Sequence, residues 1–148
     1  MATSKVIDVK GDFTYKEMIA SGAISPGHLE ERTSTANTVK VHATQGGFAQ
    51  KAFAIQSAYT GDDYTTAYAT ATQVEVAFPA PGAEVMAIIA NGSAIAIGDK
   101  LVSAGDGTLK ELTSETKDET VVAVAVEACD MSGSSAADPD GYCIVEIV

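Results

Sequence analysis

The residues with the widest chemical range in this chain are two histidines and two cysteines. His28 and His42 lie in neighbouring runs of β-forming residues, so a hairpin would bring both imidazole rings to one sheet. Such a pair could begin a metal site or supply a general base, but no third ligand or catalytic partner stands at a recognised spacing. We therefore expect surface or half-buried histidines without a catalytic role.

The cysteines, Cys129 and Cys143, flank a polar loop, DMSGSSAADPDG, that could bring two strand ends together. They form no C-x-x-C motif and no histidine is near either of them, so the sequence predicts no metal ligands here. The N-terminal residues lack the apolar run of an export signal, which favours a reducing cytosol. Free, partly buried thiols are the favoured interpretation, and a disulfide is the alternative.

Carboxylates are paired at Asp62-Asp63, at Glu30-Glu31, and at Asp138 and Asp140. A calcium site needs several oxygens around one ion, and the DPDG segment is too short to supply them. Asp, Pro and Gly are also ordinary turn residues. Neighbouring residues of a strand point to opposite faces, so Glu30 and Glu31 are not expected to act together as acid and base.

The common motifs of hydrolases and nucleotide-binding proteins are absent: there is no G-x-S-x-G elbow, no P-loop and no G-x-G-x-x-G after a strand. Lys100 and Lys110 flank a glycine-rich turn, as the modified lysine does in a biotinyl or lipoyl carrier, but the turn Gly105–Gly107 itself has no lysine. A carrier domain is one alternative function, and a hydrolase with scattered residues is another. We expect no enzyme activity, no cofactor and no metal.

The elements that would position these residues are strands. Apolar and polar side chains alternate in several runs, with turn residues between them. The runs are GHLEERT, TVKVHAT, KAFAIQSAY, QVEVAF, AEVMAIIA, ETVVAVAVEA and YCIVEIV. The turn signals are TSTAN, PAPG, NGS and AGDG, the last predicting a hairpin with Asp106-Gly107 at its tip. The sequence predicts an all-β domain, a small barrel or sandwich built of hairpins.

One stretch near the N-terminus carries a helical signal. Thr14 followed by Glu17 fits a capping box and Gly22 could end a short helix, whereas a loop leading into a strand at AISPG is the alternative. The fold therefore contains at most one short helix.

Residues 1–13 are predicted to form an extended N-terminal arm, and residues 14–148 the β-rich domain. The arm is either an added edge strand or a segment that orders against a partner. Its apolar and aromatic side chains are the candidate contact residues for that partner: Val6, Ile7, Val9, Phe13 and Tyr15.

Charge and composition narrow the possible partners. The chain has 148 residues, a formal charge of −11, 46% hydrophobic residues and only 6% aromatic residues. Acidic side chains repel phosphates, so neither nucleic acid nor an anionic membrane surface is an expected partner. Few aromatic residues also disfavour a deep small-molecule pocket.

Several motifs occur in a fixed order between about Ser21 and Leu112. They are PGH-L, V-x-x-H-A-T-x-G-G, G-D-x-Y, P-G-x-E-V and I-x-x-G-D-x-L-x-S-A-G-D-G-T-L, found here within ASGAISPGHLEE, VKVHATQGGFAQKAFAI and YTGDDYTTAYATATQVEVAFPAPGAEVMAIIANGSAIAIGDKLVSAGDGTLK. As an ordered set they resemble the small capsid decoration, or cement, proteins of tailed bacteriophages.

The resemblance implies a barrel-like structural protein of the virion with no catalytic residues to carry over. Such a protein would be made in the host bacterial cytoplasm and bind the capsid exterior, commonly as a homotrimer. It would clamp neighbouring major capsid protein subunits, and its N-terminal arm, here loosely Ala2 to Tyr15, would help the attachment. Many weak contacts repeated over a lattice give a large total avidity.

Overall fold

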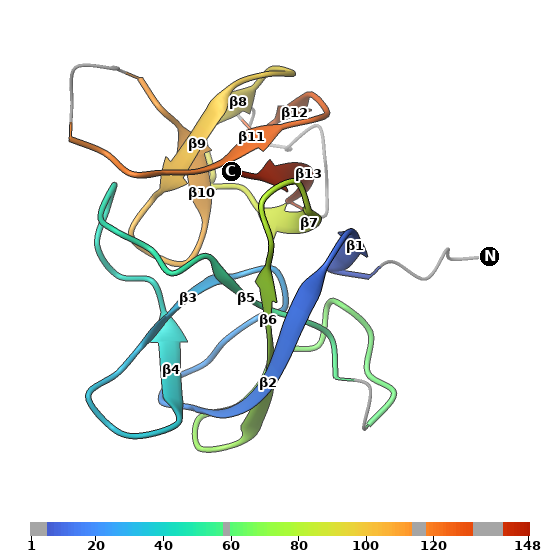
Figure 1. Cartoon of the computed structure of the whole chain (residues 1–148), viewed down its shortest axis with the longest axis vertical. Coiled ribbons are helices and arrows are strands. Elements are labelled where there is room, and N and C mark those ends of the chain that lie inside the picture. Colours follow the sequence, from blue (N-terminus) through green and yellow to red (C-terminus); the bar gives the residue numbers. More distant parts are fainter. Residues whose placement is uncertain (1–5, 58–59, 114–117, 132–140) are drawn as a thin grey trace.

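The chain is built from strands and turns wherever the structure describes it (Figure 1). The computed structural model describes residues 6–57, 60–113, 118–131 and 141–148. Thirteen strands and no helix lie within these ranges, so the all-β prediction is confirmed. No helix long and apolar enough to span a membrane occurs among these residues.

Five strands close into a small barrel: β2 (Phe13–Ala20), β3 (Leu29–Arg32), β4 (Thr38–Val41), β5 (Ala52–Ala54) and β6 (Gln73–Pro79). Their order around the barrel is β2-β4-β3-β5-β6. β2 and β4 run parallel, and the other pairs run antiparallel. The barrel has no free strand edge, so its backbone groups pair internally.

Six further strands form one antiparallel sheet: β1 (Asp8–Lys10), β7 (Glu84–Ile88), β9 (Lys100–Ser103), β10 (Leu109–Glu111), β11 (Val121–Ala125) and β13 (Tyr142–Ile147). Their order is β1-β7-β13-β11-β9-β10. A separate two-stranded sheet pairs β8 (Ala94–Ile95) with β12 (Cys129–Asp130).

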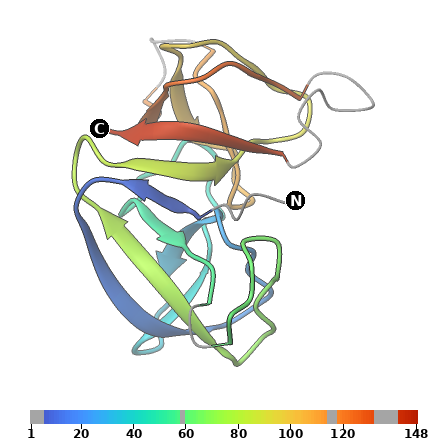
Figure 2. The ribbon, with the colours of Figure 1, turned by 90° about the vertical axis from the view of Figure 1, so that its right-hand side faces the viewer.

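The barrel and the six-stranded sheet are stacked on one another, with the barrel in the lower half of Figure 1. Figure 2 shows the same stacking from the side. Leu29 and Phe53 of the barrel strands belong to the same buried cluster as Leu101 and Leu109 of the sheet. Because this apolar core crosses from barrel to sheet, burial of these side chains holds the two parts together.

Alternation in the sequence matches burial in the strands that it predicted. In β6, Val74 and Val76 are fully buried while Gln73 is exposed. The AEVMAIIA run contains β7, which lies between β1 and β13. Val85 and Ala87 are buried on one face of this strand, and Met86 is buried on the other. A strand covered on both faces needs an apolar run rather than strict alternation.

The helix considered for TYKEMIASG is wrong. Thr14 and Glu17 lie in β2, which pairs residue by residue with β6 from Phe13 to Ile19. A capping interaction contributes only about 1 kcal/mol, and the ladder of β2 with β6 supplies many more backbone partners. The alternative, a loop leading into a strand at AISPG, is correct only for the loop. AISPG forms no strand and contributes a single β-bridge, between Ile24 and Tyr68.

Part of the predicted N-terminal arm is a strand of the sheet. β1 pairs with β7, with Asp8 opposite Val85, and forms one edge of the six-stranded sheet. Ile7 is fully buried, and the amide of Met86 donates a hydrogen bond to its carbonyl. The edge-strand interpretation therefore describes residues 8–10, while residues 1–5 lie outside the described ranges.

Candidate interaction surface

His42 is fully buried, which corrects the expectation of a surface or half-buried side chain. Its Nε2 lies 2.8 Å from the carbonyl of Phe48 and its Nδ1 lies 2.7 Å from Ser103 Oγ. A carbonyl only accepts, so Nε2 carries the proton and the Ser103 hydroxyl donates to Nδ1. The hydroxyl oxygen in turn accepts the amide of Gly105 at 3.1 Å. The imidazole therefore joins the loop between β4 and β5 to the end of β9, and both of its nitrogens are occupied within the protein.

The hairpin tip predicted at Asp106-Gly107 is confirmed, but it is docked on the barrel. β9 and β10 pair around it, and the Gly107 carbonyl accepts the amide of Leu29 at 2.8 Å. The Gly107 amide donates to the His42 carbonyl at 3.1 Å. Gly107 has φ +84°, and a β carbon there would lie 3.0 Å from Val41 Cβ, so only glycine fits this joint.

His28 is half-buried, as expected, and stands beside this joint. Its Nδ1 accepts the amide of Ser25 at 3.1 Å. Burial lowers the pKa of His28, an effect that the nearby carboxylate of Asp106 opposes. The ring therefore stays neutral at physiological pH and closes a local turn rather than presenting a base to solvent.

The loop between β4 and β5 holds a phenylalanine out in solvent. The side chain of Phe48 is 81% exposed, the largest exposure among the described large apolar residues. The backbone around it is fixed: His42 binds the Phe48 carbonyl, the Gly46 amide donates to Ser103, and the Gly46 carbonyl accepts from Thr120. An aromatic ring presented on a fixed backbone loses little further entropy on binding, as interface anchors do.

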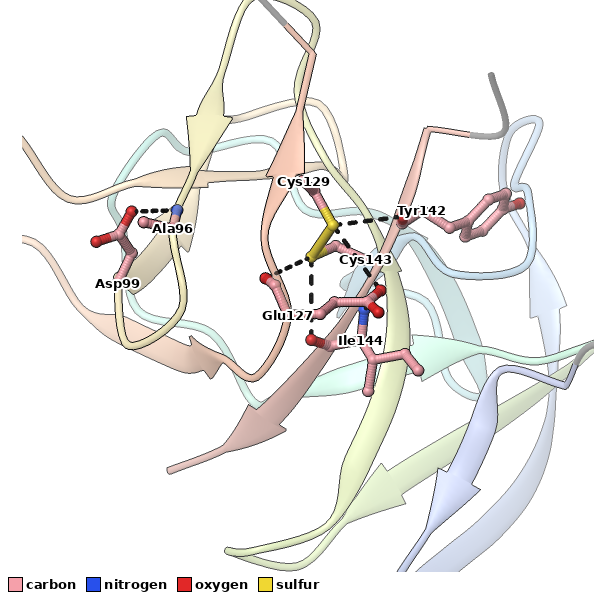
Figure 3. Close-up of a disulfide and its surroundings, with 7 residues drawn as sticks. All are labelled: Ala96, Asp99, Glu127, Cys129, Tyr142, Cys143 and Ile144. Carbon is pink, nitrogen blue, oxygen red and sulfur yellow. Dashed lines mark hydrogen bonds between the residues drawn. A yellow bond between two sulfur atoms is a disulfide. The ribbon is translucent and has the colours of Figure 1, made fainter. Parts of the chain in front are cut away.

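A second rigid turn presents Ile97, which is 71% exposed. Asp99 Oδ2 accepts the Ala96 amide at 2.8 Å, and the Asp99 amide donates to the Ala96 carbonyl at 3.1 Å (Figure 3). Gly98 takes φ +90° at the position that a type II turn reserves for glycine, and its amide donates to Ala125. Ile97 is thus a second apolar anchor on the sheet side of the molecule.

The predicted contact residues near the N-terminus divide into accessible and inaccessible ones. Val6, Val9 and Tyr15 are 44%, 39% and 54% exposed. Ile7 is fully buried in its own chain and Phe13 packs partly buried against the core. A direct contact with a partner is therefore open to the first three, and their role stays a prediction.

An open groove of about 490 Å³ runs beside Tyr15. The Tyr15 hydroxyl donates to Asp8 at 2.6 Å, and burial together with this carboxylate raises the pKa of Tyr15 to about 12. Three of the lining residues are acidic, one is basic, and the full set is Asp8, Tyr15, Lys16, Glu17, Ile55, Gln56 and Glu75. The charged side chains along the groove are therefore mainly acidic.

Glu30 and Glu31 point to opposite sides of β3, as predicted. Glu30 is fully buried in the barrel, and neither carboxyl oxygen has a hydrogen-bond partner in the protein. Burial raises the pKa of Glu30 well above its usual range, so the carboxyl is kept neutral. Glu31 lies on the outer side, 3.1 Å from Lys40 and 3.7 Å from His42. The two carboxyls form no acid/base pair.

Cys129 and Cys143 form a disulfide, which corrects the favoured expectation of free thiols (Figure 3). Their α carbons are 6.1 Å apart, within the range that a disulfide spans. The bond joins β12 to β13 and so fastens the two-stranded sheet to the larger one. The sequence shows two cysteines around a loop, but their distance depends on the pairing of β12 with β8, which is a long-range contact.

The other candidate groups that the structure describes form no catalytic set. Asp63 binds Thr65 through its hydroxyl and amide, contacts that lower the pKa of Asp63 and belong to a turn. Lys100 and Lys110 lie in β9 and β10, away from the docked tip. Asp138 and Asp140 lie outside the described residues.

The sequence reasoning missed the two rigid apolar anchors. A signal for Phe48 exists in hindsight: the G-G-F segment places an aromatic residue directly after two glycines, between two strands. Ile97 likewise precedes a Gly-Asp pair at a turn position. Neither signal reports exposure, because the fixed loops depend on hydrogen bonds to residues far along the chain.

Comparisons with known proteins add a structural likeness. No family model matches the sequence, and no curated protein matches it. One similar solved structure is the head fiber gp8.5 N base in bacteriophage phi29. It has a TM-score of 0.59 and 16% sequence identity, over 93% of this chain and 95% of that chain. At this identity the likeness is one of fold.

Proposed function

We propose that this chain is a structural protein of a tailed-phage virion that binds the outer surface of the capsid. The observation that carries the proposal is the likeness of fold to a phage head fiber base, over 93% of this chain. The ordered motifs between Ser21 and Leu112, which resemble those of capsid decoration proteins, support it independently. The partner would be the major capsid protein, and the site of action the exterior of the virion.

The finer part of the proposal is that the protein is a homotrimeric clamp between neighbouring capsid subunits. A protein that both self-associates and binds a shell needs separate contact surfaces. The loop between β4 and β5, which carries the exposed Phe48, lies on the left of Figure 1, and β1, which carries the exposed Val9, lies on the right. Two exposed apolar sites on different sides of a rigid fold supply such surfaces.

We also propose that the protein is not an enzyme. His42 has both nitrogens occupied within the protein, and Glu30 is enclosed without a neighbouring base. The biotinyl or lipoyl carrier alternative needs a lysine on an exposed hairpin tip. The tip at Gly107 is buried against the barrel instead, which counts against a swinging arm.

Co-sedimentation with expanded empty capsids of the encoding phage tests the proposal. We expect the chain to pellet with the shells at a fixed stoichiometry and to raise the temperature at which they rupture. Failure to pellet would overturn the capsid function, whereas binding without added heat resistance would overturn only the clamp. Intact mass after expression with a biotinyl or lipoyl ligase separates the carrier alternative, since we expect an unmodified chain.

Three variants assign the contact surfaces in the same assay. Val9→Asp and Phe48→Asp each place a charge at an exposed apolar site, and Ala36→Asp places one in an exposed turn as the control. We expect one of the first two to weaken pelleting and the other to change the sedimentation coefficient of the free protein. Unchanged behaviour of both variants would contradict the assigned surfaces.

A further inference from the structure

The two sulfurs of the disulfide and one nearby carboxylate form a group of three potential metal ligands. One carboxylate oxygen of Glu127 and the sulfurs of Cys129 and Cys143 all lie within 4.8 Å of one another (Figure 3). Among the residues that the structure describes, no other set of three such groups gathers this closely. Glu127 Oε1 is 3.8 Å from Cys129 Sγ, close to the ligand–ligand spacing around a tetrahedral ion.

The carboxylate is held in this position by the backbone. The amide of Ile144 donates to Glu127 Oε1 at 2.9 Å, and the carbonyl of Glu127 lies 3.5 Å from Cys143 Sγ. Glu127 lies in the bend that follows β11, Cys129 lies in β12 and Cys143 lies in β13. β11 is paired with β13, and β12 is paired with β8. Such second contacts orient a ligand before an ion arrives.

The two cysteines are buried and Glu127 is partly exposed. A pair of buried thiolates is costly without a cation close by, and a metal ion supplies that charge. Of the three groups, Glu127 is the one that solvent reaches. Two thiolates with one carboxylate form a ligand set that suits Zn²⁺ and related thiophilic ions.

We propose that the reduced form of this cluster is a binding site for Zn²⁺ or a similar thiophilic divalent cation. The ligands are Cys129, Cys143 and Glu127, with water in the fourth position. The disulfide and the metal site are alternative states of the same sulfurs. A thiol reductant takes the bond apart, forming two protein thiols and its own disulfide, and the ion then displaces one proton from each thiol.

The geometry permits both states with little movement. Around a tetrahedral Zn²⁺ with Zn–S bonds of about 2.3 Å, two sulfurs stand roughly 3.8 Å apart. Side-chain rotation supplies this separation while the α carbons, 6.1 Å apart, stay in place. β12 is therefore tied to β13 in a reducing cytosol by the ion and in an oxidising medium by the covalent bond.

Titration of the reduced protein with Co²⁺ under anaerobic conditions tests the site, because cobalt reports its ligands by absorption. We expect a thiolate-to-cobalt charge-transfer band that saturates at one ion per chain, tetrahedral ligand-field bands, and loss of both on addition of Zn²⁺. The oxidised protein should show neither band. A reduced protein without the charge-transfer band would overturn the proposal.

Variants separate the three ligands from adventitious binding. Cys129→Ser with Cys143→Ser should abolish the band, and Glu127→Gln, whose amide oxygen still accepts the Ile144 amide, should weaken Co²⁺ binding by about tenfold or more. Glu146→Gln, an exposed acid on the same strand as Cys143, is the matched control and should leave binding unchanged. Equal affinity in Glu127→Gln would remove Glu127 from the ligand set and overturn the three-ligand site. Circular dichroism of each reduced variant confirms that the fold is retained.

Discussion

The barrel and the six-stranded sheet are stabilised in different ways. The barrel closes on itself through hydrogen bonds and encloses an unpartnered carboxyl, that of Glu30. The sheet keeps two edges, β1 and β10, and its neighbouring small sheet is fastened by a disulfide. We therefore expect the stability of the barrel to depend on pH, and the stability of the sheet region to depend on whether the disulfide is reduced. Between them stands a joint, around His42 and Gly107, in which every polar group named above has a partner.

The largest effect should come from the core that the barrel and the sheet share. Phe53→Ala empties a fully buried position in that cluster, and we expect a loss of about 3–5 kcal/mol in the free energy of unfolding. Urea denaturation followed by circular dichroism measures it. Phe48→Ala, the same change at an 81% exposed position, should shift stability by no more than about 0.5 kcal/mol. Equal losses in the two variants would contradict the shared core.

The next effect concerns the sheet region alone. Under oxidising conditions, Cys129→Ser with Cys143→Ser should lower the free energy of unfolding by about 3 kcal/mol, the usual value for a loop of this size. The cysteines are 14 residues apart in sequence. Wild-type protein treated with reductant and a chelator should reach the same stability as the double variant. Hydrogen exchange should speed up most in β8 and β12, and uniform acceleration across the barrel would contradict a local role.

A substitution at the joint between barrel and sheet should lower the free energy of unfolding by a smaller amount. Ser103→Ala removes the hydroxyl that binds His42 and accepts the Gly105 amide, and we expect a loss of about 1–3 kcal/mol. The amides of Leu29 and Gly107 should exchange faster, because their hydrogen bonds cross the same joint. Ser34→Ala, in an exposed turn, is the control and should change neither stability nor exchange.

The smallest expected effect comes from Glu30 in the barrel. It concerns how the free energy of unfolding varies with pH rather than its total size. Burial holds the pKa of Glu30 well above its ordinary value near 4.5, so the folded state binds a proton that the unfolded state releases. This contribution to stability is full below the ordinary value and is lost as pH rises towards the pKa of the folded state. Glu30→Gln should remove that decline in urea midpoints with rising pH.

Glu31→Gln, on the outer side of the same strand, is the matched control for Glu30→Gln. The wild-type decline with pH should persist in it, because its carboxyl is partly exposed. A decline that survives in Glu30→Gln would place the responsible group elsewhere.

The sequence was enough to predict the class of fold and many of its strands. Alternation predicts β6 and β13, and glycine-aspartate pairs predict the hairpin between β9 and β10, because these signals are local. β2 escaped prediction because its capping-box residues are overruled by pairing with β6, some sixty residues later in the chain. The same limit explains the disulfide and the buried His42. Each depends on which distant segment covers it, and no local pattern contains that information.

The candidate surfaces were predictable only in part. The exposed residues Val6, Val9 and Tyr15 were named from their apolar character, but Ile7 was named on the same ground and is buried. A period of two cannot tell which side of an edge strand faces a partner until the neighbouring strand is placed. Phe48 and Ile97 are exposed because turns hold them out, and the turn residues rather than the apolar residues carry the signal.

The position of β13 in the sheet determines when the sheet can be completed during synthesis of the chain. This strand is translated last of the thirteen, yet it lies between β7 and β11, as Figure 2 shows, and β1 on the far side of β7 is translated first. All five barrel strands precede β13 in the chain, whereas the six-stranded sheet cannot be completed until β13 has been made. A chain without β13 would therefore leave β7 and β11 with unpaired edges, and such edges can pair with strands of other molecules.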